Sequence, residues 1–120
     1  MWRAEIFHRV VSLWLKKLTS EFGVPVKVRD DAYYELAMTQ VVSKKYDDSL
    51  KTIRTFGTVQ KQGEAYEKSR LLAADIYMAQ GHFQEAVNEF RAFKVSFPKS
   101  PYIQNVDMVL PQLEQRVKQQ

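Results

Sequence analysis

The feature that most constrains the fold is a pattern of residues that occurs twice, with a constant offset of 37 residues. Small and apolar residues recur at matching positions, so that Ala37 corresponds to Ala74 and Phe56 to Phe93. The first copy contains Leu36, Ala37, Tyr46, Ser49, Leu50, Ile53 and Phe56, and the second contains Ala73, Ala74, Phe83, Ala86, Val87, Phe90 and Phe93. A repeat of this length is typical of helical hairpins that bury their apolar faces by stacking. We therefore predict an all-α fold, a short solenoid of helical hairpins.

Apolar spacing and helix-breaking residues divide the chain into about six predicted helices within a single domain, residues 1–120. Apolar residues three or four positions apart form stripes, and Gly or Pro ends several of these stripes. The predicted segments are a leading helix over 3–22, a degenerate first repeat over 31–57, a second repeat over 64–98 and a trailing capping helix over 101–118.

The residues before the first repeat predict a connector and a helix start. Val24–Val28 should be extended, because Pro25 keeps the residue before it out of the helical conformation. Asp30 or Asp31 is the expected N-cap of a helix that begins near Ala32.

Glycine and proline predict the later boundaries. Gly57 is placed to end a helix, and Thr58–Gly63 should form a loop. Ser100 is an expected N-cap with Pro101 at the first helical position, whereas Pro111 should kink or split the last helix.

Composition excludes several classes of protein. With 120 residues and no Cys, the chain has one domain's length and cannot form disulfides or thiolate metal sites. No stretch approaches the roughly 18 apolar residues of a membrane span. The charged residues in 1–22 are unlike a signal-peptide core. Both the periplasm and the cytoplasm are compatible with this composition.

The second repeat resembles the tetratricopeptide repeat (TPR) family. The residues that carry the resemblance are Ala74, Tyr77, Gly81, Phe83, Ala86, Phe90, Phe93 and Pro98. The first repeat matches less well, since Gln40 replaces an aromatic residue and Lys44 replaces the turn glycine. Its matching residues are Tyr33, Leu36, Ala37, Tyr46 and Ser49. The resemblance implies a right-handed solenoid that binds other proteins.

A shorter stretch has a further similarity. The segments Gly81–Ala86 and Phe97–Tyr102 resemble repeats of bacterial cell-envelope proteins, such as outer-membrane assembly lipoproteins and the periplasmic partner of the Tol–Pal system. This resemblance implies a place in a bacterial envelope assembly.

No motif predicts catalysis, a metal or a cofactor. His8 and His82 lie in different segments without a second ligand at metal-binding spacing. The pairs Asp30–Asp31 and Asp47–Asp48 stand at predicted helix starts, where carboxylates satisfy N–H groups and the helix dipole. We therefore expect a protein that is not an enzyme and has no cofactor.

The face of the first helix in each hairpin is the expected binding surface, because these helices line the concave side of such stacks. The predicted groove residues are Tyr34, Met38, Val41, Leu71, Asp75, Met78, Tyr102, Asn105 and Val109. Methionine and tyrosine on an exposed helical face are typical of a surface that binds a peptide or a helix of another protein. A protein-interaction scaffold is thus the expected function.

Alternatives remain open at this stage. Positive charge is concentrated in residues 1–30 and 44–70, each with a net charge of +3, which suggests an RNA or anionic-surface binder. A secretion chaperone would be a special case of the scaffold, and no nucleic acid is the favoured expectation. The leading helix could cover the groove, pack on the first repeat as a cap, leave the groove to a partner, or form a homodimer.

Overall fold

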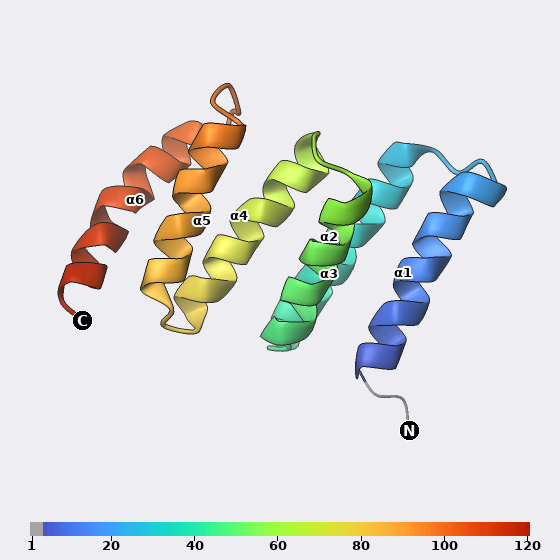
Figure 1. The fold of residues 1–120 in the computed structure, drawn as a ribbon, viewed down its shortest axis with the longest axis horizontal. Coiled ribbons are helices and arrows are strands. Elements are labelled where there is room, and N and C mark those ends of the chain that lie inside the picture. The colour runs from blue at the N-terminus through green and yellow to red at the C-terminus, as the bar shows by residue number, and fades with distance from the viewer. Residues whose placement is uncertain (1–3) are drawn as a thin grey trace. The chain divides into compact units, whose positions relative to one another are not determined.

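The computed structural model describes residues 4–120, without the side chains of Ala4, Glu5, Phe7, His8, Ser12, Leu18 and Thr19. In that part of the chain there are six α-helices and no strand, which confirms the predicted all-α class (Figure 1). The helices are α1 (Ala4–Glu21), α2 (Val26–Val42), α3 (Tyr46–Val59), α4 (Glu64–Ala79), α5 (Phe83–Ser96) and α6 (Ile103–Lys118). The predictions for residue 3 and for the side chains of Phe7, His8 and Leu18 lie outside the described residues.

The chain divides into two compact units, with the boundary inside α4. The first unit ends at Ser69 and contains α1, α2, α3 and the start of α4. The second unit is Arg70–Gln120 and contains the rest of α4 with α5 and α6. Among the described residues, none of the helices combines the length and the apolar character needed to cross a bilayer.

Aromatic packing forms the core of the first unit. The rings of Tyr33 on α2 and Phe56 on α3 are stacked with centroids 5.0 Å apart, and Tyr66 meets Phe56 edge-on at 5.8 Å. Leu15 of α1 is buried in the same cluster, and α1 contacts both α2 and α3. The interpretation that the leading helix packs on the first hairpin is therefore confirmed.

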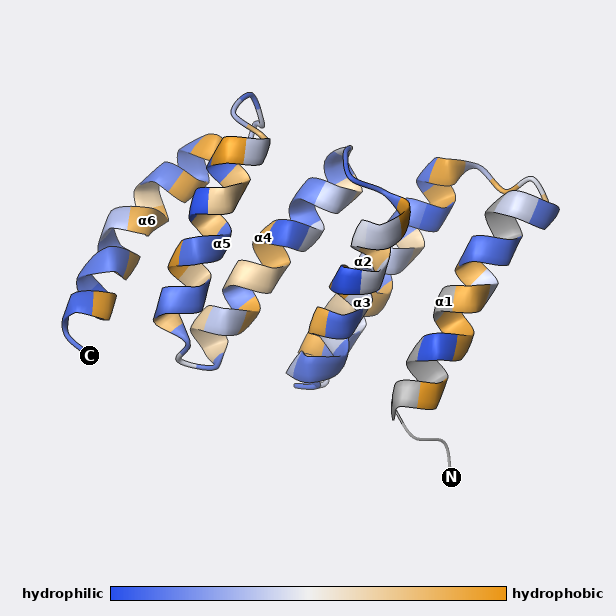
Figure 2. Cartoon of the chain, viewed as in Figure 1, coloured by the Kyte–Doolittle hydropathy of each residue, from blue (hydrophilic) through white to orange (hydrophobic). Residues whose placement is uncertain are grey.

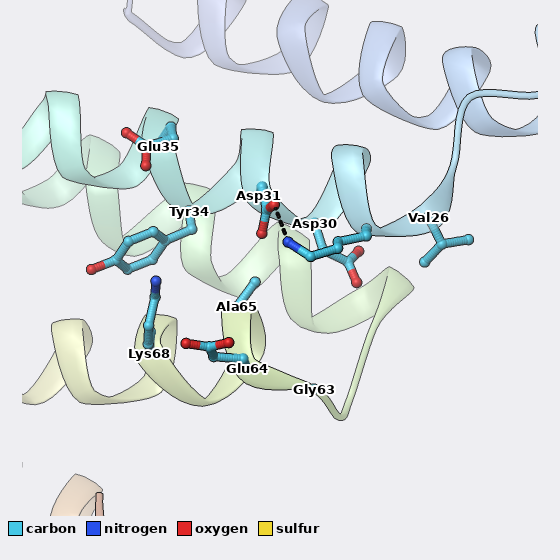
Figure 3. Close-up of a pocket in the computed structure, with 10 residues that line it drawn as sticks. Val26, Asp30, Asp31, Tyr34, Glu35, Gly63, Glu64, Ala65 and Lys68 are labelled. Carbon is cyan, nitrogen blue, oxygen red and sulfur yellow. Dashed lines mark hydrogen bonds and ion pairs between the residues drawn. The ribbon is translucent and has the colours of Figure 1, made fainter. Parts of the chain in front are cut away.

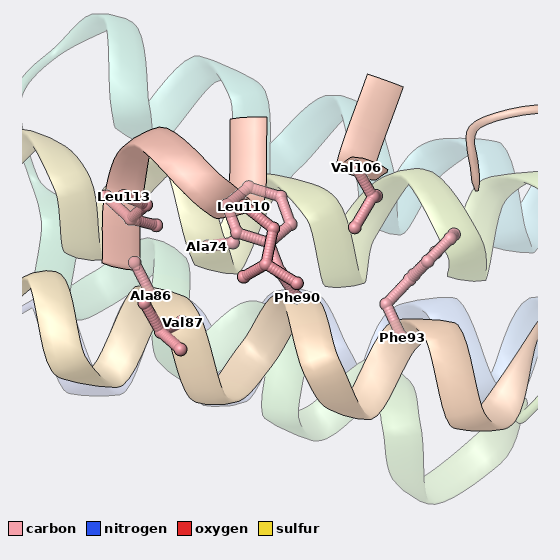
Figure 4. Close-up of a cluster of buried hydrophobic side chains, with 8 residues drawn as sticks. All are labelled: Ala74, Ala86, Val87, Phe90, Phe93, Val106, Leu110 and Leu113. Carbon is pink, nitrogen blue, oxygen red and sulfur yellow. The ribbon is translucent and has the colours of Figure 1, made fainter. Parts of the chain in front are cut away.

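Aliphatic and phenylalanine side chains form the core of the second unit (Figure 4). Ala74 and Ala86 are buried where α4 and α5 face each other, and small residues let two helices approach closely. The complete buried cluster is Ala74, Ala86, Val87, Phe90, Phe93, Val106, Leu110 and Leu113. Its members from α4 and α5 all belong to the repeated pattern and the others come from α6, so the trailing helix covers the apolar face that the hairpin leaves open.

The two hairpin turns repeat one another in backbone detail. Lys44 and Gly81, 37 positions apart, both have positive φ angles, of 59° and 77°. The residues that follow them, Lys45 and His82, have φ and ψ of −91° and 68°, and of −87° and 70°. In the first turn the N–H groups of Ser43, Lys44, Lys45 and Ser49 donate to the carbonyls of Thr39, Val41, Gln40 and Lys45, and in the second those of Gln80, Gly81, His82 and Ala86 donate to Ile76, Met78, Tyr77 and His82. Every donor and every acceptor is thus displaced by the 37 residues seen in the sequence.

Replacing Lys44 by glycine is expected to stabilise the protein. A residue with a Cβ costs roughly 1–2 kcal/mol in the left-handed region, and the freedom that glycine adds to the unfolded chain returns part of this. We expect the free energy of unfolding to rise by about 0.5–1 kcal/mol in urea denaturation. The matched control is Lys45→Gly, which should lower stability because φ is negative there. A less stable Lys44→Gly variant would contradict the repeated turn.

Helix α2 begins earlier than the sequence predicted. The extended connector and the N-cap at Asp30 or Asp31 are wrong, because Pro25 occupies the N-cap position. Its carbonyl accepts the N–H groups of Val28 and Arg29, at 3.0 and 3.3 Å. Proline restricts the residue before it, but its own ring supplies no obstacle to a helix that starts after it.

The end of α3 also differs from the prediction. Gly57 lies inside the helix, which continues to Val59, so the loop is confined to residues 60–63. Gly57 faces Tyr66, and a Cβ built on it would lie 3.7 Å from the tyrosine ring. Packing against that ring accounts for helix at a residue that commonly ends one. Asp47 and Asp48 do lie in the first turn of α3, as expected.

Helix α6 is continuous through Pro111, so the predicted split is wrong. Val106, Leu110 and Leu113 are buried on one side of α6, whereas Pro111 is exposed. Burial on both sides of the proline offsets the lost backbone hydrogen bond. At the start of α6 the Ser100 hydroxyl accepts the Tyr102 N–H at 3.2 Å, although regular helix begins only at Ile103.

Candidate functional site

A cleft of about 600 Å³ lies in the first unit, between the N-terminal parts of α2 and α4 (Figure 3). Two helices and the loop residue Gly63 supply its walls. The lining residues are Val26, Lys27, Asp30, Asp31, Tyr34, Glu35, Gly63, Glu64, Ala65 and Lys68. Four carboxylates against two ammonium groups make this lining acidic.

Ion pairs organise the charges on the α2 side of the cleft. Lys27 donates to Asp31 one helical turn later, at 2.8 Å. This hydrogen bond and the charge of Asp31 raise the pKa of Lys27, and the more distant carboxylate of Glu64 on the opposite wall adds to the shift. Both side chains of the pair are exposed, so water and a ligand can reach them.

Asp30 has a different role from Asp31. Its carboxylate is buried, accepting two hydrogen bonds from Arg29, at 2.9 and 3.1 Å, and one from Gln60, at 3.0 Å. These bonds link α2 to the residue that follows α3. A buried charge with a cationic partner and full hydrogen bonding is a structural element. The exposed acidic groups of the cleft are therefore Asp31, Glu35 and Glu64.

An aromatic ring and a lysine meet across the cleft. The Lys68 Nζ lies 4.5 Å from the centre of the Tyr34 ring, with Lys68 on α4 and Tyr34 on α2. A cation at this distance is attracted by the electron-rich ring face. Figure 3 shows the ammonium beside the ring, with Glu64 close to it. The cleft thus already places a cation where a ring and a carboxylate converge.

The two walls are related by the sequence repeat. Lys27 and Asp31 on α2 correspond to Glu64 and Lys68 on α4, 37 positions later, with the signs of the charges reversed. The sequence prediction missed these residues because it started the helix at Ala32, beyond the cleft. Extending the register of Tyr34 and Leu71 back by two helical turns would have found all four.

The predicted groove residues of the first unit lie on one face of α2. Tyr34, Met38 and Val41 are all partly buried, and of the three only Tyr34 lines the cleft. The sequence anticipated an apolar surface here, whereas the cleft around Tyr34 is predominantly charged.

The predicted groove residues of the second unit divide into two groups. Leu71, Met78, Tyr102 and Val109 pack against the buried cluster of that unit, and Asp75 and Asn105 are exposed. Neighbouring protein desolvates the carboxyl group of Asp75 enough to raise its pKa, although the residue keeps an exposed surface. The apolar members therefore serve the core as well as the surface.

Other residues that could carry chemistry are dispersed. His82 follows the turn glycine and its ring lies 6.5 Å from that of Tyr77. Within the part of the chain that the structure describes, no group of three or more His, Asp and Glu side chains is placed to hold a metal ion.

Comparisons with protein-family models, with curated proteins and with solved structures find no match to this chain.

Proposed function

We propose that this chain is a TPR-like interaction scaffold, which binds a peptide or helix of a partner protein in a bacterial envelope assembly. The observation that carries the proposal is the cleft between α2 and α4, because it lies on the helix faces that line the concave side in such repeats. The turn that recurs after 37 residues, bond for bond, supports the repeat architecture. Resemblance of the second repeat to envelope proteins supports the assembly.

The chemistry of the cleft favours a basic segment as the ligand. Asp31, Glu35 and Glu64 present exposed carboxylates that accept hydrogen bonds from lysine or arginine. The ring of Tyr34 offers a face to a cationic or apolar side chain. An RNA ligand would bring phosphates against these carboxylates, so the cleft itself favours binding of a peptide over the anionic alternative.

Selection from a random peptide library on the whole protein tests this proposal. We expect enriched peptides to contain lysine or arginine beside an apolar residue. For a selected peptide, Tyr34→Leu should weaken binding roughly 10-fold by fluorescence anisotropy, because it removes the ring face and keeps the apolar contact with the core. Asp31→Asn combined with Glu64→Gln should weaken binding similarly and reduce its dependence on salt.

The control is Glu85→Gln, since Glu85 is also an exposed carboxylate in the first turn of a helix but lies outside the cleft. Its affinity for the peptide should be unchanged. Enrichment of acidic peptides, or equal binding by the cleft variants and the control, would refute the proposed site.

A further inference from the structure

The outer face of α1 carries apolar side chains, although its inner face already packs on the core. Leu15 is buried in the first unit and Val11 packs beside it. Ile6, Leu13 and Trp14 point elsewhere and are 47%, 55% and 58% exposed. Figure 2 shows apolar residues recurring along α1. One helix thus has two apolar faces, and the unit uses only one of them.

The exposed face has the spacing of a two-stranded helical seam. Ile6, Val10, Leu13 and Lys17 follow one another at intervals of four, three and four residues, and all are exposed. This alternation keeps one line of side chains turned toward a partner helix. A shallow hollow of about 350 Å³ lies along the same face, lined by Val10, Leu13, Trp14, Lys17, Glu21 and Phe22.

Charges beside the seam select both the partner and its direction. Arg9 and Lys16 flank one edge of the seam, and Glu21 flanks the other, with all three exposed. In a parallel pair of identical helices, the residue at one edge faces the residue five positions later at the opposite edge of the partner. Lys16 of each copy would then face Glu21 of the other, which gives two reciprocal ion pairs.

An antiparallel pair would bring like edges together. Arg9 of one copy would face Lys16 of the other, and this repulsion would occur twice. Charge complementarity therefore favours a parallel arrangement of the same helix. Lys17 lies within the seam, where a single polar residue sets the register at a cost in affinity.

We propose that the chain forms a homodimer in which α1 pairs in parallel with α1 of a second copy through Ile6, Val10 and Leu13. This dimer is independent of the peptide cleft, which lies on α2 and α4. Because the seam is short and contains Lys17, the dissociation constant should be on the order of micromolar.

Sedimentation equilibrium tests the dimer. At about 100 µM the protein should have twice its monomer mass of 14.1 kDa. Leu13→Glu should weaken dimerisation roughly 100-fold, since both copies lose an apolar contact and gain facing charges. Leu13 is exposed within one chain, so helicity by circular dichroism should stay unchanged. Met108→Glu is the matched control, because Met108 is exposed on α6 and is no part of the seam.

Cross-linking tests the direction, and the absence of native cysteine makes the readout clean. In a parallel pair, Ile6→Cys and Leu13→Cys should each form a disulfide with the same residue of the second copy. An antiparallel pair allows at most one of them. Lys16→Glu should weaken the dimer, and adding Glu21→Lys should restore it. A monomer at about 100 µM would overturn the proposal, as would binding of monomers to anionic vesicles through this face.

Discussion

Replacing Phe56 by alanine is expected to lower the free energy of unfolding by about 4 kcal/mol. Phe56 is fully buried, stacks on Tyr33 and receives the edge of Tyr66, so the truncation removes two ring contacts and leaves a cavity. A loss of this size approaches the whole stability of a small domain, roughly 5–15 kcal/mol. Urea denaturation followed by circular dichroism should therefore show a large shift of the midpoint.

The control for this variant is Met108→Ala, which removes an apolar side chain that is 70% exposed. Its effect should stay within about 0.5 kcal/mol, as for most surface substitutions. If Phe56→Ala costs less than about 1 kcal/mol, the aromatic cluster does not hold the first unit together.

Replacing Thr52 by valine is expected to cost about 2 kcal/mol. The Thr52 hydroxyl donates to the Gln40 Oε1 at 2.6 Å, and both side chains are buried between α2 and α3. Valine has nearly the same shape but no donor, so the buried amide oxygen of Gln40 loses this partner. An unsatisfied buried acceptor retains its full desolvation cost.

A second substitution should recover this loss. Gln40→Met in the Thr52→Val background removes the buried acceptor and keeps an apolar side chain of similar length. We expect the double variant to regain at least half of the lost free energy, because two apolar partners need no hydrogen bond. Thr58→Val is the control, since the Thr58 hydroxyl makes only an exposed bond to the Thr55 carbonyl. Simple addition of the two single effects would contradict the coupling.

The two repeats use different pairs where they depart from the common pattern. Gln40 stands where the second repeat has Tyr77, and Thr52 of the opposite helix is its partner. Arg70 stands where the first repeat has Tyr33, and it pairs with Glu89 of the opposite helix at 2.5 Å. In both hairpins a polar substitution is matched by a polar residue on the helix that faces it, because a buried polar group without a partner would be costly.

Local patterns predicted the helices well where apolar spacing was regular. The bounds of α4 agree with the expected segment, and Gly81 adopts the positive φ that its turn requires. They failed at Pro25, Gly57 and Pro111, where a helix starts earlier, runs on or stays whole. In the last two cases packing against Tyr66 or the second core outweighs a local preference worth only about 1–3 kcal/mol.

The sequence by itself determined the helical class and the 37-residue repeat, because small and apolar residues at a fixed spacing leave few other ways to bury them. It also marked Tyr34 as a surface residue of interest. Only the tertiary structure decided that Lys27, Asp31, Glu64 and Lys68 join Tyr34 in one acidic cleft. Charged residues at helix ends carry no pattern that states which helix they will face, since that depends on where each helix starts and on how the core brings α2 and α4 together.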